Sequence, residues 1–208
     1  MKASVRWVEC PRDAWQGFSR FIPTEEKVAF LNELLEAGFA HLDLTSFVSP
    51  KWVPQMQDAE EVLKALPPPN GRTYLAIVAN EKGLERALAA PNLTHVGYPF
   101  SLSETFQQRN TNRSIEASWP LVGAMVERTE GRLGLVVYLS MAFGNPYGDP
   151  WSVEAVLEAL ARLKEMGAKF CAQGQCLEGI EWRTALEIPS DLVANEARAA
   201  DLIIVGRR

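Results

Sequence analysis

The stretch TEEKVAFLNELLEAGFAHLDL, Thr24–Leu44, decides the fold class because it holds a complete helix followed by a strand. Thr24 is a good helix N-cap, the two glutamates after it match the positive end of the helix dipole, and Gly38 is a typical stop. Ala40–Leu44 is then predicted as a short buried strand. Four apolar residues share one face of the predicted helix: Val28, Leu31, Leu34 and Leu35.

The same alternation of strand and helix runs along the chain, and this rhythm is typical of a parallel sheet or barrel. Further strands are predicted at Val5–Cys10, Tyr74–Ala79, Thr94–Tyr98 and Leu133–Leu139. Ser152 should cap a helix over Val153–Met166. We therefore predict an α/β fold of (β/α) TIM-barrel type, with about five βα units in a first region, residues 1–168.

The tail, residues 169–208, departs from this rhythm and is predicted as a strand, helix and strand remnant. A helix is expected at Asp191–Ala200 and a buried strand at Asp201–Gly206. Because an eight-unit barrel typically needs about 250 residues, the barrel is predicted to be incomplete, with an open doubly wound sheet as the alternative.

Composition narrows the class of protein. The chain has 208 residues, 47% of them hydrophobic, and a formal net charge of −5. This balance argues against nucleic acid as a partner, and no apolar run approaches the roughly 20 residues that a membrane span needs. Three cysteines, Cys10, Cys171 and Cys176, fit reduced thiols, so a cytoplasmic location is expected.

Polar residues stand where predicted strands end, which is where functional residues gather in α/β folds. Arg12 and Asp13 follow the first strand, and Asp43 lies at the end of the second. A carboxylate is a good hard-metal ligand, and a guanidinium can stabilise a developing oxyanion. The alternative is that Arg12–Asp13 is only a solvated turn pair.

Three segments resemble the hydroxymethylglutaryl-CoA lyase family: CPRD at Cys10–Asp13, FIPTEEKV at Phe21–Val28 and TSFVSPKWVPQM at Thr45–Met56. The resemblance extends over residues 1–167 and implies a metal-dependent barrel enzyme. The implied reaction is retro-Claisen cleavage of a 3-hydroxyacyl-CoA thioester to acetyl-CoA and a keto acid, with a place in leucine degradation. Two positions depart from the family pattern, because Asp43 stands for a glutamate and Val136 for an arginine.

The resemblance also implies roles for single residues. Arg12 and Asp43 would be catalytic, and Asp13 would bind Mg²⁺ or Mn²⁺. The expected partner is an acyl-CoA thioester, with homo-oligomerisation also anticipated. The implied substrate-binding residues are Gln16, Tyr138, Arg109, Asn110 and Ser114.

The family's later His-x-His metal ligands cannot be found in this sequence. The tail instead contains GIEWR at Gly179–Arg183 and ARAADLIIVG at Ala197–Gly206, and through these residues 170–208 resemble part of a universal stress protein, a nucleotide-binding family. The alternative hypothesis is therefore a non-catalytic truncated or fused fragment with nucleotide-binding ancestry in its tail.

Aromatic and histidine side chains are interpreted as structural. Trp15, Trp52 and Trp119 are expected to pack in the core, because burial is the commonest use of tryptophan. His41 and His95 have no partner histidine at metal spacing, so structural hydrogen bonds are expected.

Overall fold

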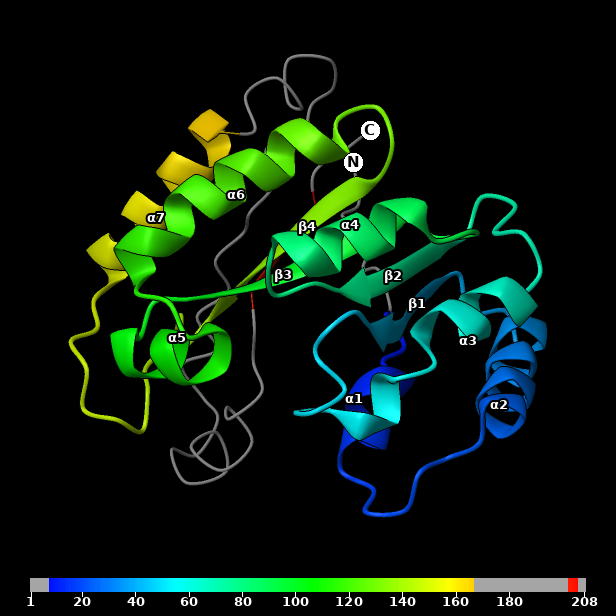
Figure 1. Cartoon of the computed structure of the whole chain (residues 1–208). Helices are drawn as coiled ribbons and strands as arrows, with labels where there is room; N and C mark the ends of the chain where they lie inside the picture. Colours follow the sequence, from blue (N-terminus) through cyan, green and yellow to red (C-terminus); the bar gives the residue numbers. More distant parts are fainter. Residues whose placement is uncertain (1–7, 167–201, 206–208) are drawn as a thin grey trace. The chain divides into compact units, whose positions relative to one another are not determined.

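A computed structural model of the chain describes residues 8–166 and 202–205 (Figure 1). Helices and strands alternate along it, as the sequence predicts. The helices are α1 Pro11–Gln16, α2 Thr24–Glu36, η1 Pro54–Met56, α3 Ala59–Ala65, α4 Glu81–Ala89, α5 Glu104–Thr111, α6 Ile115–Thr129 and α7 Val153–Met166. The strands are β1 His41–Ser46, β2 Thr73–Ile77, β3 His95–Ser101, β4 Gly134–Ser140 and β5 Leu202–Val205.

The strands form one sheet in the order β1-β2-β3-β4-β5, and the β1–β2 and β2–β3 pairs are parallel. Parallel strands joined by helices make this an α/β fold, which confirms the predicted class. The β1–β2 register shifts between Asp43 and Thr45. This irregularity falls beside a predicted site residue.

Element positions follow the sequence pattern closely. The predicted helix Val153–Met166 is α7, residue for residue, and Ser152 caps it by accepting from the backbone N–H of Ala155 at 3.1 Å. Of the predicted strand Val5–Cys10, Glu9 forms a parallel bridge with Leu42, and residues 5–7 lie outside the described part. The strand expected near residue 201 is β5, and the helix expected at 191–200 lies outside the described residues.

By its internal contacts the chain divides into two compact units. Among the described residues, unit 1 comprises residues 8–98 and 127–136, and unit 2 comprises residues 99–126, 137–166 and 202–205. In unit 1, α2 and α3 pack against each other, and α1 and α3 both contact β1. Leu31 and Leu42 are fully buried there, as expected for the apolar faces of α2 and β1.

The start of α2 corrects one prediction. Thr24 is the first helical residue and not the N-cap, a position that Pro23 occupies without a side-chain hydrogen bond. The Thr24 hydroxyl instead donates to Asp58 Oδ2 at 2.7 Å. A tertiary carboxylate partner has taken the hydroxyl that the local pattern assigns to the helix end.

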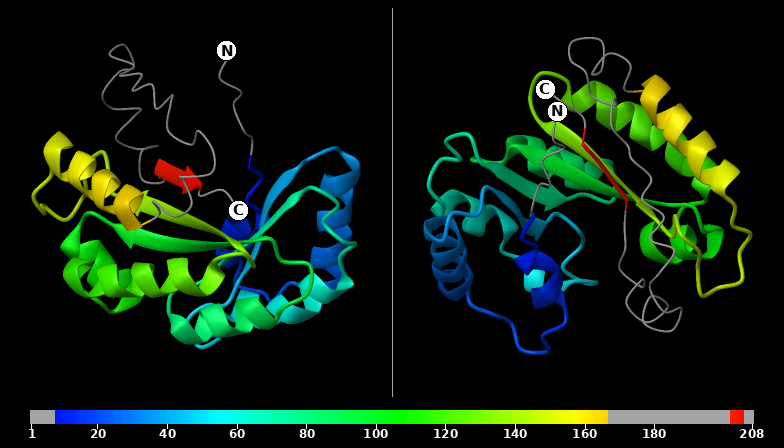
Figure 2. Two further views of the ribbon diagram at one scale, coloured as in Figure 1. Left: turned by 90° about the horizontal axis from the view of Figure 1, so that it is seen from above. Right: turned by 180° about the vertical axis from the view of Figure 1, so that it is seen from behind.

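In unit 2, α6 and α7 lie side by side (Figure 2). Trp119 of α6 is buried, packs against Phe100 in a tilted arrangement with 4.4 Å between ring centroids, and lies under the Arg162 guanidinium of α7. Arg162 also pairs with Glu116 at 3.5 Å. This packing confirms the structural interpretation of Trp119.

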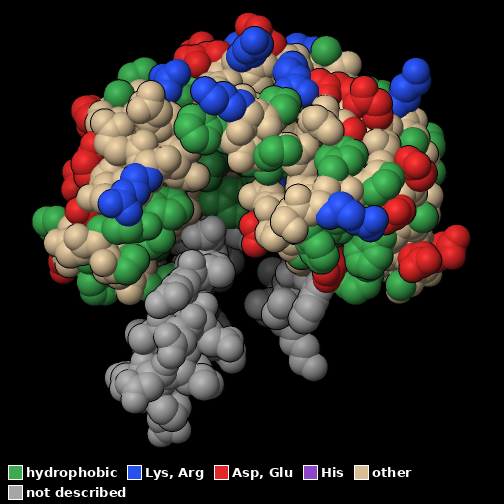
Figure 3. Space-filling model, turned by 60° about the horizontal axis from the view of Figure 1, so that its bottom comes forward, with side chains coloured by type: hydrophobic (Ala, Val, Ile, Leu, Met, Phe, Trp, Pro, Cys, Tyr) green, Lys and Arg blue, Asp and Glu red, His purple; other side chains and the backbone are tan. Residues whose placement is uncertain are grey.

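The surface carries mixed charge. Figure 3 shows lysine and arginine side chains interspersed with aspartate and glutamate over the visible face. Within the described ranges, no helix is both long and apolar enough to cross a membrane.

Candidate active site

The short helix α1 places the first pair of candidate residues. Pro11 stands in its first turn, where the missing N–H costs nothing, and Asp13 brings negative charge to the positive end of the helix. Trp15 is buried and meets Phe30 edge to face, as expected for a packing residue. Burial of Trp15 anchors the helix, and Arg12, one turn earlier, reaches Asp43 of β1.

Arg12 and Asp43 form a bidentate ion pair. Arg12 Nε donates to Asp43 Oδ1 at 3.2 Å, and Arg12 Nη2 donates to Asp43 Oδ2 at 2.6 Å. The Asp43 side chain is 1% exposed and that of Arg12 is 13% exposed. A planar guanidinium matches a carboxylate in this way, which a lysine cannot do. The two predicted catalytic residues therefore lie together, although 31 positions separate them in the sequence.

Cys10 adds a third donor to the same carboxylate. Its Sγ donates to Asp43 Oδ2 at 3.1 Å. Burial, followed by the nearby Asp43 charge, raises the pKa of the Cys10 thiol to about 12, so it stays protonated at neutral pH. Burial acts to lower the pKa of Arg12, but the charge of Asp43 and its hydrogen bond outweigh this and raise it above the ordinary value. The site is thus a fixed cation held by a fixed anion.

The remaining nitrogen of Arg12 faces the surface. Arg12 Nη1 donates to Asp13 Oδ1 at 3.2 Å and to Gln16 Oε1 at 3.1 Å. Asp13 is 69% exposed, and Gln16 is also exposed. Four of the predicted site residues, Arg12, Asp13, Gln16 and Asp43, therefore make one continuous cluster in unit 1.

This cluster supplies too few ligands for the expected divalent metal ion. Across residues 8–166 and 202–205, no three His, Cys, Asp or Glu side chains converge as a metal site would require. A hard divalent cation takes six or more oxygen ligands, and Asp13 supplies one carboxylate. The described residues alone do not fit a divalent ion.

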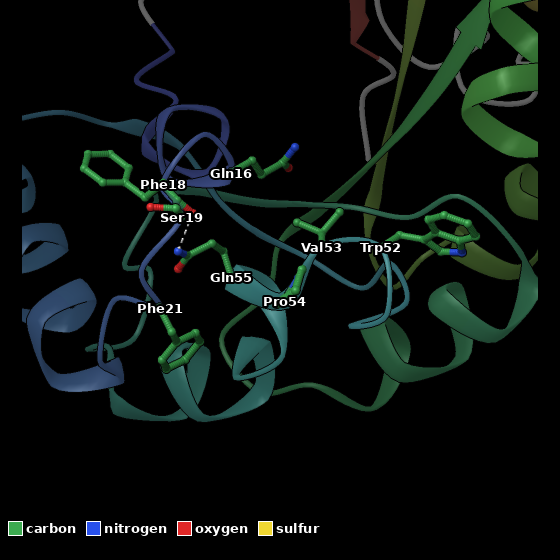
Figure 4. Close-up of a pocket in the computed structure, with 8 residues that line it drawn as sticks. All are labelled: Gln16, Phe18, Ser19, Phe21, Trp52, Val53, Pro54 and Gln55. Atoms are coloured by element: carbon green, nitrogen blue, oxygen red, sulfur yellow. Dashed lines mark hydrogen bonds between the residues drawn. The ribbon is translucent and has the colours of Figure 1, made fainter.

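A pocket of about 260 Å³ lies beside the cluster, and Gln16 belongs to both (Figure 4). Trp52 lines it and is 79% exposed, so the expectation that Trp52 packs in the core is wrong. The whole lining is Gln16, Phe18, Ser19, Phe21, Trp52, Val53, Pro54 and Gln55.

The pocket wall is braced by buried polar groups that the sequence analysis missed. The Gln55 side chain donates to Phe18 O at 3.0 Å and accepts from Ile22 N at 3.0 Å. Lys27, 1% exposed, donates to the Gln55 carbonyl and to Asp58 Oδ1, the latter at 2.7 Å. These bonds join α2 to the segment that follows β1 and to the segment that follows α1.

The histidines behave as predicted. His41 Nδ1 lies 2.8 Å from Thr73 Oγ1, and His95 Nδ1 lies 2.9 Å from Thr94 Oγ1. Both are ordinary structural hydrogen bonds, which agrees with the expected role.

The other predicted substrate-binding residues lie in unit 2. Arg109 and Asn110 are exposed near the end of α5, and the Arg109 guanidinium lies 5.0 Å from the Tyr147 ring centroid. Ser114 accepts from the backbone N–H of Ala117 at 3.0 Å and so caps α6. Tyr138 is half-buried on β4. Ser114 thus has a structural role that the sequence pattern did not indicate.

Comparison with known proteins identifies relatives. Over 168 residues the chain is 33% identical to the hydroxymethylglutaryl-CoA lyase YngG of Bacillus subtilis, covering 80% of this chain and 56% of that protein. Over 158 residues it is 38% identical to the mouse mitochondrial hydroxymethylglutaryl-CoA lyase, covering 76% of this chain and 48% of that enzyme. The chain therefore spans about half the length of these relatives. No protein-family model matches it.

Comparison with solved structures also finds similarity to hydroxymethylglutaryl-CoA lyases. An HMG-CoA lyase from Acinetobacter baumannii, in complex with coenzyme A and 3-methylmalate, superposes with a TM-score of 0.72 at 28% identity, covering 77% of this chain and 52% of that one. The Bacillus subtilis HMG-CoA lyase superposes with a TM-score of 0.72 at 34% identity, covering 77% of this chain and 54% of that one. These neighbours are TIM barrels, which confirms the predicted fold type. The comparisons give no support to a universal stress protein at residues 170–208, most of which lie outside the described part.

Proposed function

From this relationship to the hydroxymethylglutaryl-CoA lyases, we propose that the chain carries the Arg12–Asp43 part of a carbon–carbon lyase site. The proposed reaction converts hydroxymethylglutaryl-CoA to acetyl-CoA and acetoacetate. The observation that carries the proposal is the buried bidentate pair, with its remaining Arg12 nitrogen facing exposed Asp13 and Gln16. Assignment to leucine degradation depends on this substrate and is part of the same proposal.

The reaction requires a cation at a defined place. A base takes the proton of the substrate's tertiary hydroxyl, and that oxygen becomes the ketone of acetoacetate. The electron pair of the breaking carbon–carbon bond moves onto the acetyl-CoA fragment as a thioester enolate, which then takes up a proton at carbon. Negative charge is present on the enolate oxygen only from the cleavage of the carbon–carbon bond until carbon is protonated. A preorganised hydrogen-bond donor at that oxygen therefore accelerates the step.

Arg12 has the properties that such a donor needs. Asp43 fixes the guanidinium through two of its nitrogens, and Cys10 donates to the same carboxylate, so the group does not reorganise as charge develops. Arg12 Nη1 is the donor on the exposed side, and a substrate oxygen would replace Asp13 or Gln16 as its acceptor. Asp43 is thus a positioning residue, and Arg12 is the proposed catalytic one.

We also propose that Asp13 contributes one oxygen to a divalent cation, Mg²⁺ or Mn²⁺, with its other ligands outside the described residues. Such an ion would polarise substrate oxygens. The proposed partner is an acyl-CoA thioester, a class supported by the coenzyme A in the Acinetobacter baumannii structure. In unit 2, Arg109, Asn110, Ser114 and Tyr138 are the candidate contacts for it. A cytoplasmic location and a homo-oligomer also belong to the proposal, testable by cell fractionation and light scattering.

The test measures coenzyme A binding and turnover separately. Purified 208-residue chain is titrated with coenzyme A, and acetoacetate release from hydroxymethylglutaryl-CoA is followed with Mn²⁺. We expect binding of coenzyme A, with turnover well below the ordinary enzyme range of about 1 s⁻¹ and above. A hybrid that joins the downstream half of a homologous lyase after Gly167 should restore turnover.

Two results would contradict the proposal. The first is a 208-residue chain that binds ATP and not coenzyme A, which would favour the nucleotide-binding alternative. The second is a folded hybrid that stays inactive, which would show that Arg12 and Asp43 do not serve this reaction. Turnover by the chain alone above about 1 s⁻¹ would overturn the expected slowness but not the assigned reaction.

A further inference from the structure

The loop that follows β4 is fastened to the start of α5 by one carboxylate. Asp149 Oδ2 accepts from the Ser103 hydroxyl and from the backbone N–H of Thr105, the latter at 2.8 Å, and Oδ1 accepts from Thr105 Oγ1 at 2.9 Å. Ser103 is itself the N-cap of α5, because its Oγ accepts from Phe106 N at 3.1 Å. Asp149 therefore closes the first turn of α5 from a position 44 to 46 residues away.

The same loop is closed on itself by Asn145. Asn145 Oδ1 accepts from the backbone N–H groups of Tyr147 and Asp149, both at 3.0 Å, and Asn145 Nδ2 donates to Asp149 O at 2.9 Å. Gly148 has φ +77, a left-handed conformation that suits glycine. The loop Asn145–Asp149, here named the Asp149 latch, therefore holds Tyr147 in one place.

Tyr147 in turn contacts the helix that carries the candidate coenzyme A residues. Its ring lies 5.0 Å from the Arg109 guanidinium and 6.2 Å from the Phe106 ring. A guanidinium stacked over an aromatic face has fewer accessible rotamers than a free one. The chain of contacts thus runs from Asp149 through Tyr147 to Arg109, all within unit 2.

We propose that Asp149 is a positioning residue for coenzyme A, and that its latch holds Tyr147 so that the Arg109 guanidinium is oriented to bind a coenzyme A phosphate. This inference rests on the proposed function, because it takes coenzyme A as the ligand. Arginine pairs with phosphate through two parallel N–H groups, and a guanidinium already held in direction loses less entropy on binding.

The electrostatics of the latch agree with this role. The hydrogen bonds from the Ser103 hydroxyl and the Thr105 backbone lower the pKa of Asp149 below its ordinary value, so the acceptor is charged at neutral pH. Replacement by asparagine keeps the shape but puts an NH₂ group where one carboxylate oxygen accepted. Asparagine offers one neutral acceptor oxygen in place of two charged ones, so in either orientation of the amide at least one of the three donors on Ser103 and Thr105 loses its acceptor.

The test is a double-mutant cycle on the full 208-residue chain. Dissociation constants for coenzyme A are measured by calorimetry for wild type, Asp149→Asn, Arg109→Ala and the double variant. Glu154→Gln, an exposed carboxylate at the start of α7, is the matched control. Amide hydrogen exchange at Thr105 and Tyr147 reports whether the latch has opened.

If the inference holds, Arg109→Ala weakens binding about tenfold or more and Asp149→Asn weakens it several-fold, as expected for loss of one charged contact. The double variant then binds no worse than Arg109→Ala alone, because Asp149 acts only through Arg109. Glu154→Gln should bind like wild type. Asp149→Asn should also speed exchange at Thr105.

Other outcomes overturn it in distinguishable ways. Additive losses in the double variant, or wild-type affinity in Asp149→Asn with an opened latch, would show that Asp149 does not position Arg109. Unchanged exchange in Asp149→Asn would show that the carboxylate does not hold the loop. A wild-type chain that does not bind coenzyme A would refute the proposed function itself.

Discussion

Two buried ion pairs in unit 1 differ in how completely the protein satisfies them. In Lys27–Asp58, the ammonium reaches Asp58 and the Gln55 carbonyl and lies 4.4 Å from the Phe21 ring centroid, and the two side chains are 1% and 9% exposed. In Arg12–Asp43, the carboxylate is just as buried. Arg12, however, directs its remaining donor to exposed Asp13 and Gln16.

This difference distinguishes an ion pair that only stabilises the fold, here called a brace, from one that can bind a ligand. An ammonium surrounded by internal partners can only hold segments together, as Lys27 does for α2 and the residues after η1. A guanidinium that uses two nitrogens on a buried carboxylate and turns the third outward can exchange partners with a ligand. The hydrogen-bond partners of each cation are therefore more informative about its function than its burial is.

Breaking the brace should have the largest effect. Lys27→Met removes the cation but keeps most of the length of the side chain, and it leaves the buried Asp58 charge with the Thr24 hydroxyl as its partner among the described side chains. We expect the free energy of unfolding to fall by about 3–5 kcal/mol, the cost of removing one partner of a buried pair. Urea unfolding followed by circular dichroism measures it.

Lys64→Met is the matched control, because Lys64 is exposed on α3 and its loss should change stability by less than about 0.5 kcal/mol. A Lys27→Met variant as stable as this control would show that the pair does not brace unit 1.

Breaking the site should change rate more than stability. Arg12→Lys keeps the charge but loses the planar fork that engages Asp43, so the donor to the enolate oxygen is misplaced. In the hybrid joined after Gly167, we expect kcat to fall about 10²–10³-fold, by analogy with loss of one oxyanion donor. Steady-state acetoacetate release gives kcat and KM together.

Arg20→Lys serves as the control for this substitution, since the Arg20 side chain is 81% exposed and its contact with Glu26 is long, at 3.9 Å. If Arg12→Lys keeps its kcat, Arg12 belongs to the rim of the site and takes no part in the chemistry.

A third pair, Arg86–Glu60, is partly exposed to solvent and extends the comparison to ion pairs that water can reach. Its side chains are 30% and 39% exposed, and its bonds of 2.7 and 2.8 Å are bidentate. The hydrogen bond from Arg86 lowers the pKa of Glu60 below 4.5, although burial opposes this. The contribution of the pair to the free energy of unfolding is thus fully present above pH 4.5. It is lost as the pH falls through the lowered pKa of Glu60 in the folded state.

Solvent screening keeps this effect small, and Glu60→Gln should cost less than about 1 kcal/mol at pH 7. The difference in unfolding free energy between wild type and Glu60→Gln should shrink on acidification, while Glu33→Gln, an exposed control on α2, shows no such trend. A difference that grows toward acid pH would mean that Glu60 is not stabilised by Arg86.

The element pattern was predictable because it depends on short-range properties. Short β-rich buried runs between helical segments of period 3.6 located β1 to β4 to within a few residues, and the predicted bounds of α7 agree residue for residue. Errors arose where a distant partner competed with a local preference. Thr24 is a good N-cap by type, but Asp58, 34 positions away, takes its hydroxyl.

Side-chain environments were harder to predict than elements. Tryptophan is usually buried, and Trp15 and Trp119 are, but Trp52 is exposed beside the pocket. Gln55 lies within the quoted segment TSFVSPKWVPQM and Asp149 in a loop, but neither was given a role, because amides and carboxylates are common in loops and only their partners make them important.

The sequence by itself determined the βα rhythm and, through CPRD and TSFVSPKWVPQM, the family resemblance with Arg12, Asp13 and Asp43 as candidates. Only the tertiary structure decided that Arg12 and Asp43 pair bidentately, that Lys27 is a brace and that Asp149 fastens the Tyr147 loop to α5. The reason is physical. A period or a cap is set within a few residues of chain, whereas an ion pair depends on which distant strands and helices become neighbours and on how much water they exclude.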